Sequence, residues 1–162
     1  MPTVNPADIV YTPDWVVNRI LSYVRPEGRI LDPCSGEGAF YSRIPKCEWC
    51  EIRKGKDFFK YNEKVDYVIG NPPYSIFEEF LRHSFAIAMN VSYIVPCHKV
   101  FQRKKIMNMV NDYGGIKHMW VLGGGRQQTG FNFGFPCANF LFSKGYKGPT
   151  TVVLGADQGG AA

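Results

Sequence analysis

Apolar positions along the chain follow two different spacings, and each spacing predicts one kind of element. Short apolar runs bounded by turn-forming residues predict strands near residue 30, over 46–52, up to 70, and over 91–96, 116–122, 137–143 and 151–154. Apolar residues three and four positions apart predict helices over 13–24, 76–89 and 99–113. Because the helices fall between strands, this order predicts one α/β domain with a mostly parallel sheet and a terminal antiparallel hairpin.

The first predicted helix has a well-defined start. We expect Thr12 as its N-cap and Pro13 at its first helical position, because the missing N–H of proline needs no partner there. Asp14 in the first turn is favourable to the helix dipole.

The strand that reaches Gly70 ends abruptly at Asn71-Pro72-Pro73-Tyr74. Neither proline can donate a hydrogen bond to a neighbouring strand, so the chain leaves the sheet at this corner. The corner holds acceptors rigidly, namely the Asn71 side-chain oxygen and the carbonyls of Asn71 and Pro72. Two converging acceptors suit the two hydrogens of an exocyclic NH2 group, and Tyr74 offers a ring face for stacking. A plain strand exit with a core aromatic residue is the simpler interpretation.

A glycine-containing turn follows the strand near residue 30. Its sequence is Asp32-Pro33-Cys34-Ser35-Gly36-Glu37-Gly38-Ala39-Phe40. Glycines after a strand let the backbone approach a ligand closely at the carboxyl end of a sheet. Tyr41 stands where a dinucleotide-binding fingerprint has a third glycine, so a pyrophosphate ligand is disfavoured. A purely structural turn is the alternative.

An acidic residue ends the next predicted strand. Glu51 lies nineteen positions after Asp32, where α/β nucleotide-binding folds hold ribose hydroxyls with a carboxylate. Glu48 is the competing candidate, although it lies in the middle of the predicted strand.

Composition narrows the class of protein. With 162 residues, 45% hydrophobic and 20% charged, the chain is expected to be one soluble domain over 1–162, with an N-terminal extension at 1–10 and a frayed tail at 155–162. It shows no membrane-length apolar run and no secretory leader, so we expect a cytoplasmic protein. Five scattered cysteines, including Cys47 and Cys50, predict reduced thiols and no metal site. The net charge of +5 suits a polyanionic partner.

The corner, the glycine turn and the helix start together resemble a known family. Asn-Pro-Pro-Tyr at 71–74, Asp-Pro-x-x-Gly-x-Gly-x-Phe at 32–40 and Tyr-Thr-Pro at 11–13 are similar to motifs of the amino methyltransferases that use S-adenosylmethionine. The resemblance implies a compact, single-domain Rossmann-like methyltransferase fold with S-adenosylmethionine as cofactor. It also implies that the corner binds the amine to be methylated, which in this family is most often N6 of adenine.

The resemblance further implies which residues contact the cofactor. They are Tyr11, Thr12, Asp32, Pro33, Gly36 and Gly38 at the methionine portion, Glu51 at the ribose, Asp57 and Phe58 at the adenine, and Asn71 beside the reactive end. Phe77, at the start of the following helix, is a further candidate for the cavity wall, whereas His98 is expected to be a solvated loop residue. Only Ile52–Lys56 separate Glu51 from Asp57, so the helix and third strand usual in this family are expected to be missing or reduced.

The stretch at 123–136 mixes glycines with phenylalanines, and this predicts a loop that closes over a planar base. By resemblance, an aromatic residue here stacks on the target base opposite Tyr74. Phe133 is the first candidate and Phe131 the second, with core packing as the alternative. Contacts with the nucleic-acid backbone are expected from Arg103, Lys104, Lys105 and Arg126.

These observations predict transfer of a methyl group from S-adenosylmethionine to the N6 amine of adenine in DNA, with catalysis by proximity and orientation at Asn71, Pro72, Pro73 and Tyr74. A target in a duplex would have to flip out of the helix. An RNA adenine methyltransferase would share these motifs. A protein glutamine methyltransferase and a catalytically inactive nucleic-acid-binding module are further alternatives. No separate target-recognition domain is expected, so specificity would come from the loops, an accessory protein or a homo-oligomer.

Overall fold

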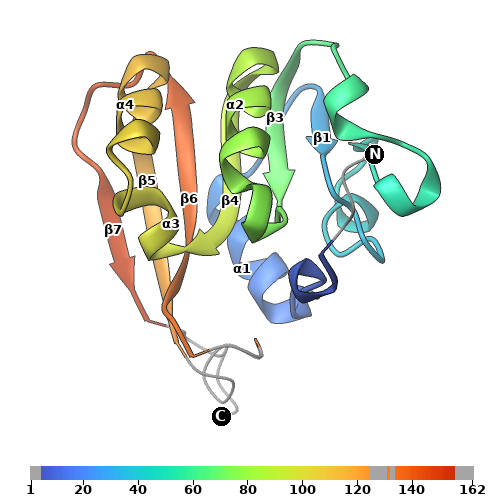
Figure 1. The fold of residues 1–162 in the computed structure, drawn as a ribbon, viewed down its shortest axis with the longest axis horizontal. Helices are drawn as coiled ribbons and strands as arrows, with labels where there is room; N and C mark the ends of the chain where they lie inside the picture. Colours follow the sequence, from blue (N-terminus) through green and yellow to red (C-terminus); the bar gives the residue numbers. More distant parts are fainter. Residues whose placement is uncertain (1–4, 125–130, 132–133, 156–162) are drawn as a thin grey trace.

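The computed structural model describes residues 5–124, 131 and 134–155, whose strands form a single seven-stranded sheet. The strands are β1 (Ile30–Asp32), β2 (Glu48–Trp49), β3 (Val65–Gly70), β4 (Ala88–Pro96), β5 (Gly114–Gly123), β6 (Cys137–Lys144) and β7 (Thr151–Leu154). The α-helices of the described residues are α1 (Asp14–Val24), α2 (Phe77–Ile87), α3 (Cys97–Phe101) and α4 (Lys104–Tyr113). The order across the sheet is β2-β1-β3-β4-β6-β5-β7 (Figure 1).

Strand directions confirm the predicted α/β class with a mostly parallel sheet. β2, β1, β3 and β4 run parallel to one another, and β7 runs parallel to β5. β6 is antiparallel to both of its neighbours, β4 and β5. β5 and β6 form the predicted antiparallel hairpin, and β7 pairs with the other edge of β5.

Two glycines allow the chain to reach the far side of β5. After β6, the chain passes the start of β5 before it enters β7. A Cβ atom on Gly114 would lie 2.1 Å from the Ser143 carbonyl oxygen, and one on Gly115 would lie 2.7 Å from that of Tyr146. Any larger residue at these positions would push the crossing backbone away, so the glycines set the place of β7.

Helices cover both faces of the sheet and bury two separate apolar clusters. α2 and α4 lie in front of the strands in Figure 1 and pack on the cluster that contains Val68. α1 packs on the cluster that contains Ile69. Val68 and Ile69 are adjacent in β3 and belong to different clusters because successive side chains of a strand point to opposite faces of the sheet. β3 and β4 are buried on both sides, as expected for the centre of a parallel sheet. No helix in the described ranges is long and apolar enough to cross a membrane.

The start of α1 differs from the prediction by one residue. Pro13 is the N-cap, and no side chain caps the helix there. The Thr12 hydroxyl instead accepts a hydrogen bond from Asn71 Nδ2 at 3.1 Å. A tertiary contact 59 positions away thus replaces the local capping bond that the sequence predicts.

Three other predicted elements have different bounds. The strand predicted over 46–52 is reduced to the two residues of β2, and β4 begins at Ala88, directly after α2. The helix predicted over 99–113 is divided into α3 and α4, because Arg103 has an extended backbone with φ −112° and ψ 119°.

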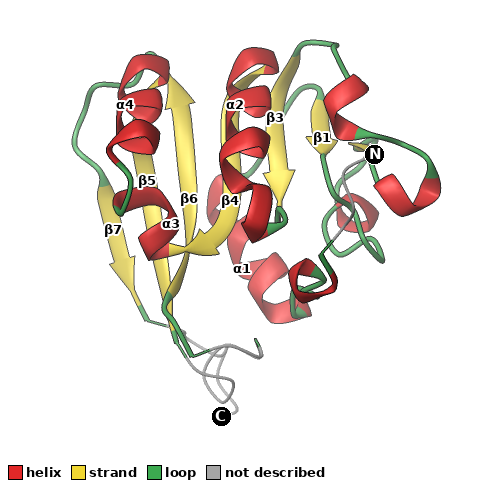
Figure 2. Ribbon diagram, in the orientation of Figure 1, coloured by secondary structure: helices red, strands yellow, loops and turns green. Residues whose placement is uncertain are grey.

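Two short helical turns replace the usual helix and third strand after Glu51. They are η3 (Ile52–Lys54) and η4 (Phe58–Lys60), and they lie beside β1 (Figure 2). Each is capped by the acid that precedes it, since Glu51 accepts from Arg53 N and Asp57 accepts from Phe59 N. The compact version expected from the short spacing is what the structure shows.

Candidate functional site

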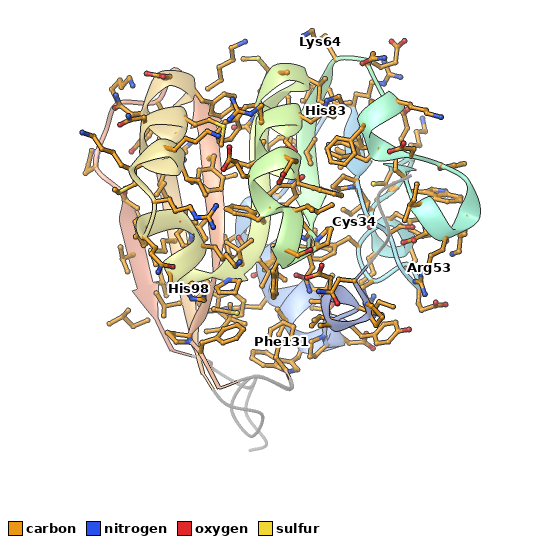
Figure 3. All side chains as sticks on the ribbon, viewed as in Figure 1. Cys34, Arg53, Lys64, His83, His98 and Phe131 are labelled. Carbon is orange, nitrogen blue, oxygen red and sulfur yellow. The ribbon has the colours of Figure 1, made fainter. Side chains whose placement is uncertain are left out.

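Two adjoining cavities lie at the carboxyl ends of β1 and β3, where ligands bind in α/β folds. The first encloses about 900 Å3, open to solvent, between the N-terminal segment, the glycine turn, η3 and η4, and the corner after β3. The second lies over the glycine turn. Val10, Tyr11, Cys34, Gly36 and Asn71 line both cavities. Figure 3 labels Cys34 and Arg53 at this end of the molecule.

The glycine turn is built around the buried carboxyl of Asp32. This side chain accepts hydrogen bonds from the backbone N–H groups of Cys34 and Tyr41, each at 3.3 Å. Burial raises the pKa of Asp32 to about 7, against the lowering by those two bonds. Gly38 has a φ of +96°, and a Cβ atom there would lie 2.9 Å from the Tyr41 ring. The turn therefore requires glycine at this position.

Glu51, which follows β2, binds the backbone of the glycine turn and of η3. Its Oε2 accepts from Gly36 N at 2.8 Å, and its Oε1 accepts from Arg53 N at 3.1 Å and Arg53 Nε at 3.2 Å. Although burial acts to raise it, these hydrogen bonds lower the pKa of Glu51. Glu48 instead pairs with Arg29 at 2.5 Å, on a different surface. Glu51, and not Glu48, lines the cavity.

The corner after β3 is held by neighbours on three sides. Asn71 Nδ2 donates to Thr12 Oγ1 at 3.1 Å and to the Val10 carbonyl at 3.4 Å. The Asn71 carbonyl accepts from the Cys34 thiol at 3.2 Å, and burial raises the pKa of that thiol, so it keeps its proton. Asn71 Oδ1 is buried and has no hydrogen-bond partner among the described residues. The corner thus retains one strong acceptor that the protein does not use.

The sequence matches no protein-family model and no curated protein, but the structure resembles solved ones. A Listeria monocytogenes protein assigned to the class I S-adenosylmethionine-dependent methyltransferases superposes with a TM-score of 0.64 at 13% identity, covering 90% of this chain and 65% of the other. The methyltransferase subunit of a type I restriction-modification system from Streptococcus thermophilus superposes with a TM-score of 0.64 at 15% sequence identity. This match covers 90% of this chain and 47% of the other. The 23S rRNA methyltransferase ErmE superposes with a TM-score of 0.57 at 13% sequence identity, covering 82% of this chain and 70% of the other.

The fold is that of the class I S-adenosylmethionine-dependent methyltransferases. This chain spans less than two thirds of the length of the Listeria and Streptococcus proteins. Sequence identities of 13–15% establish the methyltransferase fold only, so the reaction has to be inferred from the residues of the site.

Most residues predicted at the site of this methyltransferase fold line one of the two cavities. These are Tyr11, Thr12, Asp32, Pro33, Gly36, Gly38, Glu51, Asp57, Phe58, Asn71 and Pro73. Pro72 and Tyr74 belong to the corner but are buried and are not among the residues that line the two cavities. Burial also raises the pKa of Tyr74 well above its ordinary value, and its predicted stacking on a base stays a prediction. Phe77 is 2% exposed and belongs to the core, whereas Phe80 of the same helix reaches the first cavity.

Residues 5–10 belong to the cavity wall and are not a simple extension. Asp8 lines the first cavity, and its carboxylate accepts from both the backbone N–H and the hydroxyl of Ser75. A short helical turn, η1 (Pro6–Asp8), begins with Asn5 accepting from Ala7 N. The Asn5-Pro6 pair is itself a capping signal and could have indicated this turn.

The predicted base-stacking residues have different outcomes. Phe131 is 1% exposed and packs in the same cluster as Ile94 and Leu122. Its position agrees with the alternative of core packing, and in this structure its ring offers no face to a base. Phe133 and Arg126 lie outside the described residues, so their roles stay predictions.

The predicted backbone-binding cations lie on the surface at the start of α4. Lys105 Nζ lies 2.6 Å from Glu78 Oε1, and Arg103 lies 4.0 Å from the other oxygen of the same carboxylate. Lys104 is exposed. His98, in α3, is exposed and meets the Phe135 ring edge-on at 5.5 Å. In the described part of the chain, no group of three or more His, Cys, Asp or Glu residues could hold a metal ion.

Proposed function

We propose that this protein binds S-adenosylmethionine in the two cavities and methylates the N6 amine of adenine in DNA. The observation that carries the proposal is the buried Asn71 Oδ1 without a partner, in a corner that adjoins both cavities. A buried acceptor without a hydrogen bond is costly, and such groups persist where a ligand supplies the missing donor. An exocyclic NH2 group is such a donor.

The donors and acceptors around the cavities fit the cofactor. The Ser35 hydroxyl, which lines the second cavity, is also buried without a partner in the described residues. The backbone has positive φ at both Gly36 and Gly38. At Gly36, no atom lies within 4 Å of the place of a Cβ atom, so a ligand has room over this part of the turn. Asp32 would face the amino group of the methionine portion, Glu51 the ribose hydroxyls, and Asp57 with Phe58 the adenine.

The protein's contribution to the reaction is orientation and desolvation. Asn71 Oδ1 and the Pro72 carbonyl would accept the two hydrogens of the target amine and turn its lone pair toward the methyl group. When bound, S-adenosylmethionine supplies a methyl carbon on a cationic sulfur, so the amine gains the methyl and loses a proton to water while the sulfur leaves as a neutral thioether. The first cavity is open to solvent, and its mostly apolar walls would exclude water from the developing charge once both ligands fill it.

Charge and exposure support a nucleic-acid substrate. The chain carries a net charge of +5, and the exposed cations at the start of α4 would contact phosphates. Arg103 and Lys105 have side chains that are 71% and 69% exposed, although that of Glu78 is only 18% exposed, so a phosphate can reach both cations in competition with Glu78. The Streptococcus protein is a subunit of a restriction-modification system, so an accessory protein or a second copy is a reasonable source of sequence specificity.

RNA is the second candidate substrate. The similarity to ErmE, a 23S rRNA methyltransferase, is the observation that favours it. Adenine N6 in RNA presents the same two amine hydrogens to Asn71, so the corner does not distinguish the two nucleic acids.

Transfer of labelled methyl groups tests the proposal directly. Wild type, Asn71→Ala and the control Asn108→Ala, an exposed asparagine on α4, are each incubated with labelled S-adenosylmethionine and unmethylated DNA, structured RNA or protein. We expect N6-methyladenine in DNA from wild type and Asn108→Ala, and a loss of at least about a hundredfold in Asn71→Ala. Label found in RNA alone would show that the substrate is RNA and not DNA. Label in none of the three would refute the proposal.

A further inference from the structure

The side chain of Asn71 has one orientation that its surroundings permit. A backbone carbonyl can accept a hydrogen bond but cannot donate one. The end of the amide that lies 3.4 Å from the Val10 carbonyl must therefore be the NH2 group. The same nitrogen lies 3.1 Å from Thr12 Oγ1, so both bonds hold Oδ1 on the opposite side, away from residues 10–12.

Residues 5–12, which we call the N-terminal strap, contact the corner on both sides of its prolines. Before the prolines, Val10 and Thr12 bind the Asn71 amide. After them, the Asp8 carboxylate binds Ser75 through its backbone N–H at 3.1 Å and through its hydroxyl. The prolines lack N–H groups and cannot make such bonds themselves, so the strap supplies the contacts that fix the corner.

The two bonds to the Asn71 amide differ in strength. The bond to Thr12 has ordinary length, and Thr12 is 9% exposed, so water cannot easily replace its hydroxyl. The bond to Val10 is near the upper limit of hydrogen-bond length and is weak. Without the Thr12 hydroxyl, the amide would keep only the weak bond to Val10 and its contact with the Tyr74 hydroxyl. Rotation of the amide would then become easier and would direct its NH2 group at the target amine, where two donors would face each other.

From this geometry we infer that Thr12 is a positioning residue, which holds the Asn71 amide so that Oδ1 is the atom presented to the target amine. This inference rests on the methyl transfer proposed above and assigns Thr12 a role beyond contact with the cofactor. It also links the two ligands, because the strap that lines both cavities holds the acceptor for the amine.

Kinetics of Thr12 variants separate positioning from cofactor contact. Thr12→Val keeps the shape and removes the hydroxyl, Thr12→Ser keeps the hydroxyl, and Thr151→Val makes the same change at an exposed position on β7. We expect Thr12→Val to lower kcat about tenfold at saturating cofactor, the value of one hydrogen bond. In Thr12→Val, the KM for DNA and the Kd for S-adenosylmethionine should change less than about threefold. Thr12→Ser should recover most of the kcat that Thr12→Val loses, and Thr151→Val should behave like wild type.

Two kinetic outcomes would overturn the inference. One is a weaker affinity for S-adenosylmethionine in Thr12→Val with an unchanged kcat at saturation, which would make Thr12 a cofactor contact alone. The other is a Thr12→Ser variant as slow as Thr12→Val, since a retained hydroxyl would then have no effect.

A spectroscopic measurement gives an answer even if no nucleic acid is methylated. The side-chain amide protons of Asn71, assigned by their absence in Asn71→Ala, should exchange with solvent about tenfold faster in Thr12→Val than in wild type, because one hydrogen bond protects them less. Equal exchange rates in the two proteins would refute the positioning role. Absence of methyl transfer by wild type would instead refute the proposed function, so the two failures are distinguishable.

Discussion

Replacing Asp32 with asparagine tests the charge state of the glycine turn. Asp32 is 1% exposed, and burial raises its pKa from 3.8 to about 7, with a further increase from the nearby Glu51 and an opposing effect of the two backbone hydrogen bonds. Between about pH 4 and pH 7, the folded chain therefore keeps a proton that the unfolded chain has lost. Because the folded state binds more protons in this window, the free energy of unfolding falls as the pH rises.

The size of the effect follows from the two pKa values. One pKa unit corresponds to about 1.4 kcal/mol, so the buried carboxyl destabilises the fold by about 2 kcal/mol at pH 5.5 and by about 4 kcal/mol above pH 7. The side chain in Asp32→Asn has nearly the same shape as the carboxyl group but does not titrate. Between pH 5.5 and pH 8, wild type should thus lose about 2 kcal/mol more stability than the variant.

Urea unfolding of both proteins at the two pH values measures this difference. Burial also lowers the pKa of His118, but this group is the same in both proteins and its effect cancels in the comparison. If wild type and Asp32→Asn lose stability equally, or if wild type loses less, then Asp32 is not buried in its protonated form and the reasoning is wrong.

Three further predictions concern other parts of the site and surface. Glu51→Gln should weaken S-adenosylmethionine binding about tenfold in calorimetry, because an amide offers one acceptor where the carboxylate offers two; an unchanged Kd would contradict the ribose role. Gly38→Ala should lower the free energy of unfolding by about 1–3 kcal/mol, since its φ is +96° and the new Cβ would press on the Tyr41 ring; a loss below about 0.5 kcal/mol in urea unfolding would show that the turn relaxes. Lys105→Gln should reduce the salt dependence of DNA binding by about 0.9 in log–log slope with little effect on stability. A slope equal to that of the control Lys64→Gln, at the residue before β3, would exclude a phosphate contact.

The parts of the site that the sequence predicts are those whose chemistry is local. The Asn71 corner follows from two adjacent prolines after an apolar run, and the glycine turn follows from a strand with closely spaced glycines. Of the two acidic candidates, Glu51 lines the first cavity because it follows the end of β2, whereas Glu48 begins β2 and lies on a different surface. In each case, neighbours along the chain decide the geometry.

The predictions that differ from the structure depend on contacts between distant residues. Thr12 has every local feature of an N-cap, yet its hydroxyl binds Asn71. The β5–β6 hairpin could be expected from sequence order, but the parallel pairing of β7 with β5 depends on the crossing at Gly114, which no local pattern shows. The break at Arg103 lies within a continuous basic run and carries no glycine or proline to mark it.

The short helical turns after Glu51 are held by two carboxylates that also line the first cavity. Glu51 and Asp57 each cap one turn and each also line the first cavity. Here the carboxylates that would recognise the cofactor also hold residues 52–60 in place. Occupancy of the cavity should therefore be readable as slower amide hydrogen exchange in this segment, which makes the segment a natural reporter for inhibitor screening.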